Sequence, residues 1–198
     1  GGSIPSLPIF MFVSILPGDG IGKEVVPQAV RVLEAVASQW NIELQLENLP
    51  YGADHYLETG VTMPEGEFAR LADQADAILL GCLGDPRVKD GRHARDILLG
   101  LRFRLDLYIN FRPIHCWSEA LVPLRGKSAS DIDFVVFREN TEGLYTGLGG
   151  RMHQGTAREV ATQTMVCTQP GVERIIRAAF EWARAHGRRK VCLADKAN

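Results

Sequence analysis

Short apolar runs alternate with segments of helical periodicity along the first half of the chain. The run over residues 11–16 predicts a strand, and residues 42–46, where apolar and polar side chains alternate, predict a half-buried one. A helical stretch over 64–72 precedes a fully apolar strand over 77–82. Between the first two strands, helical spacing joins these positions: Val26, Val30, Leu33, Val36 or Ala37, and Trp40. This order predicts an α/β fold with largely parallel strands.

The pattern changes after about residue 105, where strand-like stretches follow one another with few helices between them. Three such strands are expected over 107–111, 134–137 and 160–167, and a last one over 191–194. Pro170 in a first turn and Gly187 just past the end predict a helix from 170 to about 186. We therefore expect two parts, residues 4–105 and residues 106–198.

Composition excludes several classes of protein. The 198 residues are 45% hydrophobic and 23% charged, with a net charge of −2, which gives no reason to expect nucleic acid or a membrane as partner. No apolar run approaches the length of about 18 residues that spans a bilayer. The four cysteines are widely spaced, which argues against a zinc site or a disulfide framework and favours the reducing cytoplasm.

A glycine-rich turn, Gly18-Asp19-Gly20-Ile21-Gly22, joins the first predicted strand to its helix. It departs from the Gly-x-Gly-x-x-Gly dinucleotide pattern, because the third glycine comes one residue early. Glycines there allow a ligand to approach the backbone, and helix amides could face an anion. Taken alone, the turn is better explained as a tight strand-to-helix connection.

Arginines lie where strands and a helix end: Arg102 and Arg104 on a predicted helix, Arg112 after a strand and Arg138 at the end of another. Guanidinium groups bind carboxylates through paired hydrogen bonds. Each of these arginines, taken singly, is more often a solvated surface residue. Spacing alone leaves their convergence open.

Tyr145 and Lys196 form a candidate acid/base pair. Their side chains normally titrate at about 10 and about 10.4, too high for easy proton transfer at neutral pH. Burial or a neighbouring cation would lower either value towards the useful range. A single tyrosine or lysine is structural in most proteins, so the pattern alone does not decide.

Five ordered segments together resemble the metal-dependent β-decarboxylating 2-hydroxyacid dehydrogenases, the isocitrate/isopropylmalate dehydrogenase family. The segments span nearly the whole chain, and five in order are far more specific than one. They are Leu16-Pro17-Gly18-Asp19-Gly20-Ile21-Gly22, Gly81-Cys82-Leu83-Gly84-Asp85-Pro86, Leu101-Arg102 with Asn110-Phe111-Arg112-Pro113, Arg138-Glu139-Asn140-Thr141-Glu142-Gly143-Leu144-Tyr145, and Asp195-Lys196-Ala197-Asn198. The resemblance implies the three-layer α/β fold of that family, incomplete in this chain, with residues 4–105 in the large domain and 106–198 starting the substrate and dimerisation domain.

The resemblance also implies a role for each matching position. Tyr145 protonates the enol carbon after decarboxylation, and Lys196 acts near the hydroxyl being oxidised. In this family the lysine and tyrosine of one site come from different subunits, so a homodimer is implied, with residues 147–168 as the arm that clasps the partner. The implied carboxylate-binding residues are Arg102, Arg112 and Arg138, and those beside the nicotinamide nucleotide, NAD or NADP, are Ile21, Leu83 and Gly84.

The family's reaction needs a divalent cation, Mg²⁺ or Mn²⁺, which polarises the carbonyl formed by oxidation so that carbon dioxide can leave. The resemblance places the metal ligands and most of the nucleotide site downstream of Lys196, so no metal ligand is expected in this chain. We therefore expect a fragment that needs the missing part for activity. The alternative of another class is a non-catalytic dimerisation module.

Substrate choice is expected to depend on the residues before Arg102. Leu98 and Leu99 resemble the apolar contacts of isopropylmalate enzymes, and the Asp96 carboxylate would repel a further substrate anion placed beside it. This favours 3-isopropylmalate. The alternatives are that both leucines pack into the core, or that Arg92 and Arg95 accept an extra carboxylate, as in isocitrate or homoisocitrate enzymes. Residues 149–152 also resemble tartrate/malate enzymes.

Overall fold

The computed structural model describes residues 9–194 and divides the chain into two compact units between Leu105 and Asp106. The first unit has a three-stranded parallel sheet in the order β2-β1-β3, so β1 is central. Its elements are β1 (Ile9–Leu16), α1 (Gly22–Trp40), β2 (Ile42–Asn48), α2 (Ala53–Thr59), α3 (Glu65–Gln74), β3 (Ala77–Leu80) and α4 (Arg92–Arg104). The sequence predicted this alternation, although α2 was missed.

The core of the first unit lies between the sheet and the helices α3 and α4. Ile97 of α4 is fully buried, and Leu71 of α3 is 1% exposed. The remaining members of this cluster come from β1, from the connections after β2 and from the same two helices: Leu16, Leu49, Met63, Phe68 and Leu101. Removal of this apolar surface from water, worth about 25 cal/mol per Å², is the main term holding the unit together.

The second unit combines an antiparallel pair of strands with one long helix and a hairpin. Helix α5 begins where the side chain of Thr168 accepts a hydrogen bond from the Gly171 N–H at 3.1 Å, with Pro170 in its first turn. The elements are β4 (Ile109–His115), β5 (Asp133–Glu139), β6 (Gly149–Met152), β7 (Val160–Gln163) and α5 (Gln169–Ala185), with short 3₁₀ turns at Glu119–Leu121, Ala129–Asp131 and Leu144–Thr146. β4 pairs with β5, and β6 with β7.

Helix α5 covers one face of the β4–β5 pair. The ring of Trp182 lies 5.6 Å from that of Phe111 and 5.8 Å from that of Phe137, measured between centroids. Phe111 and Phe137 stand opposite each other across the two strands. Because side chains alternate between the faces of a strand, their neighbours Arg112 and Arg138 lie on the face away from α5.

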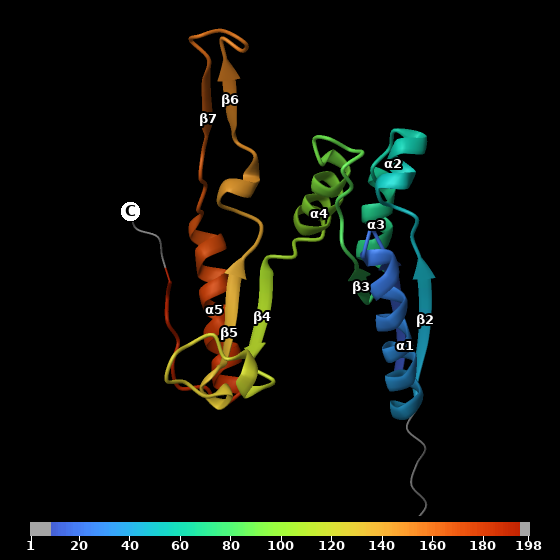
Figure 1. Ribbon diagram of the computed structural model, residues 1–198, viewed down its shortest axis with the longest axis vertical. Helices are drawn as coiled ribbons and strands as arrows, with labels where there is room; N and C mark the ends of the chain where they lie inside the picture. The colour runs from blue at the N-terminus through green and yellow to red at the C-terminus, as the bar shows by residue number, and fades with distance from the viewer. Residues whose placement is uncertain (1–8, 195–198) are drawn as a thin grey trace, which may run out of the picture. The chain divides into compact units, whose positions relative to one another are not determined.

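The β6–β7 hairpin extends past the start of α5, within the second unit (Figure 1). Every residue of both strands is exposed. The carboxylate of Glu142 holds its base, accepting hydrogen bonds from the Thr168 N–H at 2.8 Å and the Thr168 hydroxyl at 2.5 Å. A two-stranded hairpin is only marginally stable alone, so this attachment fixes where it leaves the body of the unit.

One strand prediction is wrong, and two were too long. Residues 191–194 form no strand, because a strand needs a neighbouring backbone to pair with. Among the described residues of the second unit, β4 pairs only with β5, and β6 pairs only with β7. Leu193 is accordingly 80% exposed. β3 ends at Leu80, opposite the last residue of β1, and the Gly81 N–H makes the final bond of this ladder to the Leu16 carbonyl at 2.7 Å. β7 ends at Gln163, before an isolated bridge at Val166.

None of the helices within residues 9–194 is long and apolar enough to cross a membrane.

Candidate active site

The connections that follow the strands of the first unit meet at the carboxylate of Asp19, which is 2% exposed. One carboxylate oxygen accepts a hydrogen bond from the Ala53 N–H at 2.6 Å, and the other accepts one from the Gly84 N–H at 2.8 Å. Asp19 follows β1, Ala53 begins the helix after β2, and Gly84 lies in the loop after β3. Ligands of open α/β sheets bind beyond the carboxyl ends of the strands, so this edge is the candidate site of the first unit.

A histidine completes this buried cluster. Nε2 of His93, on the first turn of α4, lies 2.7 Å from the second oxygen of Asp19, and the ring is fully buried. An ionised carboxylate can only accept, so Nε2 carries the proton and donates it. Burial raises the pKa of Asp19, but the hydrogen bonds from Ala53, Gly84 and His93 outweigh it, and the pKa lies below its ordinary value.

Three glycines allow the loops after β1 and β3 to pack against each other. A Cβ on Gly18 would overlap the Cys82 carbonyl oxygen, and a Cβ on Gly22 or Gly81 would overlap the Pro17 carbonyl oxygen. For these glycines the tight-connection interpretation of the sequence is sufficient. Packing of the loops, rather than contact with a ligand, requires them.

Two further glycines in these loops face open space. A Cβ on Gly20 or Gly84 would have no atom within 4 Å, and both have positive φ, +48° and +146°. Ile21 is 60% exposed, and Leu83 is half-buried against the core. An apolar side chain beside backbone that carries no side chain leaves room for a flat ring to approach, so these residues fit a nicotinamide nucleotide.

Helix α4 separates core residues from the predicted substrate residues. Ile97 and Leu101 enter the core cluster, whereas Leu98, Leu99 and Arg102 are half-buried. None of the three belongs to that cluster of described residues. The alternative that both leucines serve mainly to pack the core is therefore not favoured, and their contact with substrate stays a prediction.

In the second unit, Arg138 and Tyr145 lie together. A guanidinium N–H of Arg138 donates to the Tyr145 hydroxyl oxygen at 2.5 Å, and its carbon lies 5.0 Å from the ring centroid. Asn110 stands opposite Arg138 across the strands, and its side-chain oxygen accepts a hydrogen bond from Nε of Arg112 at 2.5 Å. Both arginines and the tyrosine thus belong to one polar cluster on the face away from α5.

The remaining predicted residue is Lys196, which lies outside the described residues, as do Asp195, Ala197 and Asn198. Within residues 9–194, no cluster of three or more His, Cys, Asp or Glu side chains could hold a metal ion. Metal chemistry is therefore assigned to no residue described here. Convergence of the site residues of the two units stays a prediction.

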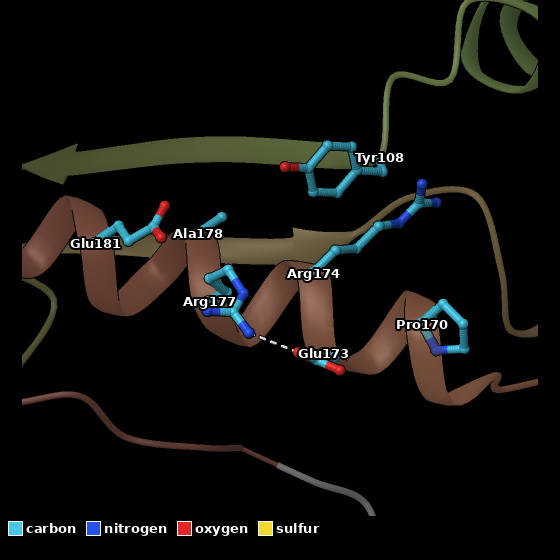
Figure 2. A pocket seen from close by; sticks show the side chains of 7 residues that line it. All are labelled: Tyr108, Pro170, Glu173, Arg174, Arg177, Ala178 and Glu181. Atoms are coloured by element: carbon cyan, nitrogen blue, oxygen red, sulfur yellow. Dashed lines mark hydrogen bonds and ion pairs between the residues drawn. The ribbon is translucent and has the colours of Figure 1, made fainter.

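A pocket of about 300 Å³ lies on the surface of α5 near the start of β4 (Figure 2). Arg174 makes the most contacts described for this pocket. Its guanidinium carbon lies 4.5 Å from the Tyr108 ring centroid. It also forms ion pairs with Asp106 at 2.9 Å and with Glu139 at 3.4 Å. Although burial raises the pKa of Glu139, hydrogen bonds from Thr141, the Glu142 N–H and Arg174 lower it overall. Arg174 is occupied by these contacts, which tie α5 to the segment before β4. No predicted site residue lines this pocket.

Sequence reasoning missed two members of these clusters, His93 and Asn110. Asn110 lies two residues before Arg112 on a strand, and period-two spacing could have found it. His93 is 74 positions from its partner Asp19. A histidine among polar residues at the start of a predicted helix gave no local sign of that contact.

Comparison with known proteins identifies the family. The model of the isocitrate/isopropylmalate dehydrogenase family matches residues 12–198. A 3-isopropylmalate dehydrogenase of Streptomyces griseus is 47% identical over 94% of this chain and 52% of its own length. The D-malate dehydrogenase (decarboxylating) of Escherichia coli is 42% identical over 95% of this chain and 52% of its own length. The chain therefore belongs to the isocitrate/isopropylmalate dehydrogenase family, as its motifs predicted.

A solved structure agrees with this assignment. Isocitrate dehydrogenase from Methylococcus capsulatus superposes with a TM-score of 0.75 at 31% identity, over 90% of this chain and 49% of that one. The predicted α/β class is confirmed. The chain spans about half the length of the curated relatives it matches.

Proposed function

We propose that the protein containing this chain oxidises and decarboxylates a 2-hydroxy dicarboxylic acid, with 3-isopropylmalate favoured and a nicotinamide nucleotide as hydride acceptor. The observation that carries the proposal is the hydrogen bond of 2.5 Å between Arg138 and Tyr145, beside Arg112, in a member of this family. A phenol held against guanidinium groups combines carboxylate binding with a proton source.

The direction of the Arg138 hydrogen bond supports Tyr145 as the acid. Because the guanidinium donates, the phenol oxygen is the acceptor in this bond, and the proposed acid step passes the phenol's own proton to another group. In the proposed reaction that group is the enol carbon left after carbon dioxide departs. Arg112, Arg138 and Arg102 would hold the carboxylates, and Lys196 would act near the hydroxyl.

Exposed backbone near Gly84 and the apolar side chain of Ile21 support nucleotide binding at the edge of the first sheet. The nucleotide accepts the hydride when bound, and the choice between NAD and NADP stays open. A divalent cation, Mg²⁺ or Mn²⁺, remains an expectation from the family. The described residues offer no ligand set for it, and no step here is assigned to it.

Two observations favour 3-isopropylmalate over other acids. Leu98 and Leu99 are half-buried next to Arg102 on α4, where an alkyl group could rest on them. Several relatives that match this chain are 3-isopropylmalate dehydrogenases. D-malate is the main alternative, because a relative at 42% identity acts on it. Isocitrate, homoisocitrate and tartrate remain further candidates.

We also propose that the protein forms a homodimer through the β6–β7 hairpin. Both strands are entirely exposed, and the exposed fractions of Met152 and Val160, which stand opposite each other, are 58% and 42%. A second copy would bury these side chains and complete an otherwise marginal hairpin. The same hairpin would serve the alternative, a dimerisation module that makes no product.

The test is a steady-state assay of the protein expressed from its complete coding sequence. Reduction of NAD or NADP is followed with each of the five candidate acids, with and without Mg²⁺. We expect the highest kcat/KM with 3-isopropylmalate. Dimers that reduce neither nucleotide with any acid would favour the dimerisation module, and Tyr145→Phe provides the matched inactive control.

A further inference from the structure

The pair formed by Asp19 and His93 lies outside the predicted catalytic groups and is almost fully buried. One carboxylate joins the loop after β1 to three other segments: the start of α2, the loop after β3 and the first turn of α4. Two of these carry proposed site residues. Gly84 donates to Asp19 directly, and α4 carries Leu98, Leu99 and Arg102.

The chemistry of the cluster requires a carboxylate at position 19. Both oxygens accept from backbone N–H groups, one from Ala53 and one from Gly84, and an amide in its place would turn an NH₂ towards one of those donors. The carboxylate also packs closely against Gly52, because a Cβ at that position would lie 2.8 Å from an Asp19 oxygen. Asp19 therefore fixes where Gly84 lies.

His93 transmits this constraint to α4. Its Nε2 contacts the same Asp19 oxygen that accepts the hydrogen bond from the Gly84 N–H, so the loop after β3 and helix α4 share one anchor. Its Nδ1 is buried and has no hydrogen-bond partner among the described residues. A buried polar atom left unpaired is costly, which indicates that the Nε2 contact outweighs that cost.

We propose that Asp19 and His93 are a positioning pair that holds the Gly84 loop at a set distance from α4, and so sets the affinities for nucleotide and acid together. This inference rests on the proposed function. Both side chains are buried, so neither touches a ligand, and their effect passes through Gly84 and the half-buried face of α4. A shared anchor predicts that one change weakens the binding of both ligands.

The experiment compares two substitutions of His93 in the protein expressed from its complete coding sequence. In His93→Gln the amide nitrogen can reach the Asp19 oxygen and donate as Nε2 does. In His93→Leu the donor is lost while the volume is kept. His55→Leu is the matched control, because His55 on α2 contacts the ring of Tyr51 and not Asp19.

We expect His93→Leu to raise KM for nucleotide and for acid, each by about tenfold, with kcat nearly unchanged, as for lost uniform binding. His93→Gln should restore both values, and His55→Leu should leave them unchanged. A merely structural role would reduce the active fraction and hence the apparent kcat, with KM unchanged. That result, or an effect on only one of the two ligands, would overturn the proposal.

A second readout does not depend on dehydrogenase activity. Amide hydrogen exchange of peptides covering residues 81–86 and 92–104 should rise together in His93→Leu and return to the wild-type level in His93→Gln. If the wild-type protein reduces no nucleotide, the proposed function has failed, and coupled exchange still decides whether His93 joins these segments. Exchange that rises in α4 alone, or in neither, would overturn the inference.

Discussion

Arg138 donates a hydrogen bond of 2.5 Å to the hydroxyl oxygen of Tyr145 and also lies over its ring. Arg138 is the second-last residue of β5, whereas Tyr145 lies on the 3₁₀ turn that leads into the hairpin. The side chain that would bind a carboxylate therefore also holds the phenol that would donate a proton. Binding and proton transfer are linked through a single guanidinium.

Replacement of Tyr145 by phenylalanine removes the proposed acid and keeps the ring under Arg138. We expect kcat to fall by about 10²- to 10⁴-fold, the usual contribution of a positioned acid, with a smaller change in KM for the acid. Steady-state kinetics with 3-isopropylmalate provide the measurement. Tyr108→Phe, whose ring stacks on Arg174, is the control, and equal losses in both variants would contradict the assignment.

Arg138→Lys keeps the positive charge but loses the planar pair of donors. Lysine binds carboxylates as a point charge and cannot both hold Tyr145 and bind in a bidentate manner. We expect kcat/KM to fall by about a hundredfold. The melting temperature should change little, because Arg138 is half-buried at the end of a strand. Arg125→Lys, at an exposed loop position, is the control. Normal kinetics in Arg138→Lys would exclude a carboxylate contact.

Leu98 and Ile97 are adjacent on α4 and should respond differently to alanine. Ile97 is fully buried, so Ile97→Ala should lower the free energy of unfolding by about 2–5 kcal/mol. Leu98→Ala should instead lower kcat/KM for 3-isopropylmalate by about tenfold and leave that for D-malate nearly unchanged. Urea unfolding and paired kinetics distinguish the two effects. Equal losses for both acids in Leu98→Ala would argue against an isopropyl contact.

Acid should destabilise the protein through Asp19. Burial raises the pKa of this carboxyl, but its three hydrogen-bond donors lower the pKa by more than burial raises it. The folded pKa therefore lies below the unfolded one. Such a group stabilises the fold above its unfolded pKa, and the contribution is lost as the pH falls through the folded pKa. Urea unfolding should therefore require less denaturant below about pH 4. Asp19→Asn should be less stable at neutral pH and less sensitive to acid, and an unchanged pH dependence would contradict this.

Glu142 offers a test of the proposed dimer, since it binds both the N–H and the hydroxyl of Thr168 at the base of the hairpin. Glu142→Ala should loosen the hairpin and weaken dimerisation by roughly tenfold, because a hairpin must then be ordered on association. Sedimentation over a range of concentrations measures this. Glu173→Ala, on the surface of α5 in an ion pair with Arg177, is the control. A monomeric wild type would exclude the dimer itself.

Periodicity predicted where helices α1, α3 and α5 lie, because burial of part of a helix face requires regular spacing. It predicted burial less well, since Trp40 of α1 is 70% exposed and Phe180 of α5 is 58% exposed. The wrong strand at residues 191–194 shows the limit of this reasoning. Apolar residues there suit a strand, but its formation depends on a partner that the local sequence does not specify. The short helix α2 was missed for a similar reason, since its first N–H is held by the distant Asp19.

The sequence named candidate site residues but not the contacts between them. Resemblance to a family assigned Arg138 and Tyr145 to one site, and their hydrogen bond is consistent with it. Asp19 was noticed only as part of a glycine-rich turn. Its partner His93 comes from a different helix, and long-range hydrogen bonds of this kind follow from the tertiary fold rather than from local pattern.

The close contact between the loops after β1 and β3 also determines where this protein can be engineered. Gly18, Gly22 and Gly81 leave no space for a methyl group, so libraries that vary them will yield mostly unfolded variants. Gly20 faces open space at a φ of +48°, which asparagine tolerates. A redesign of the proposed nucleotide-facing loop from this side of the sheet would begin there.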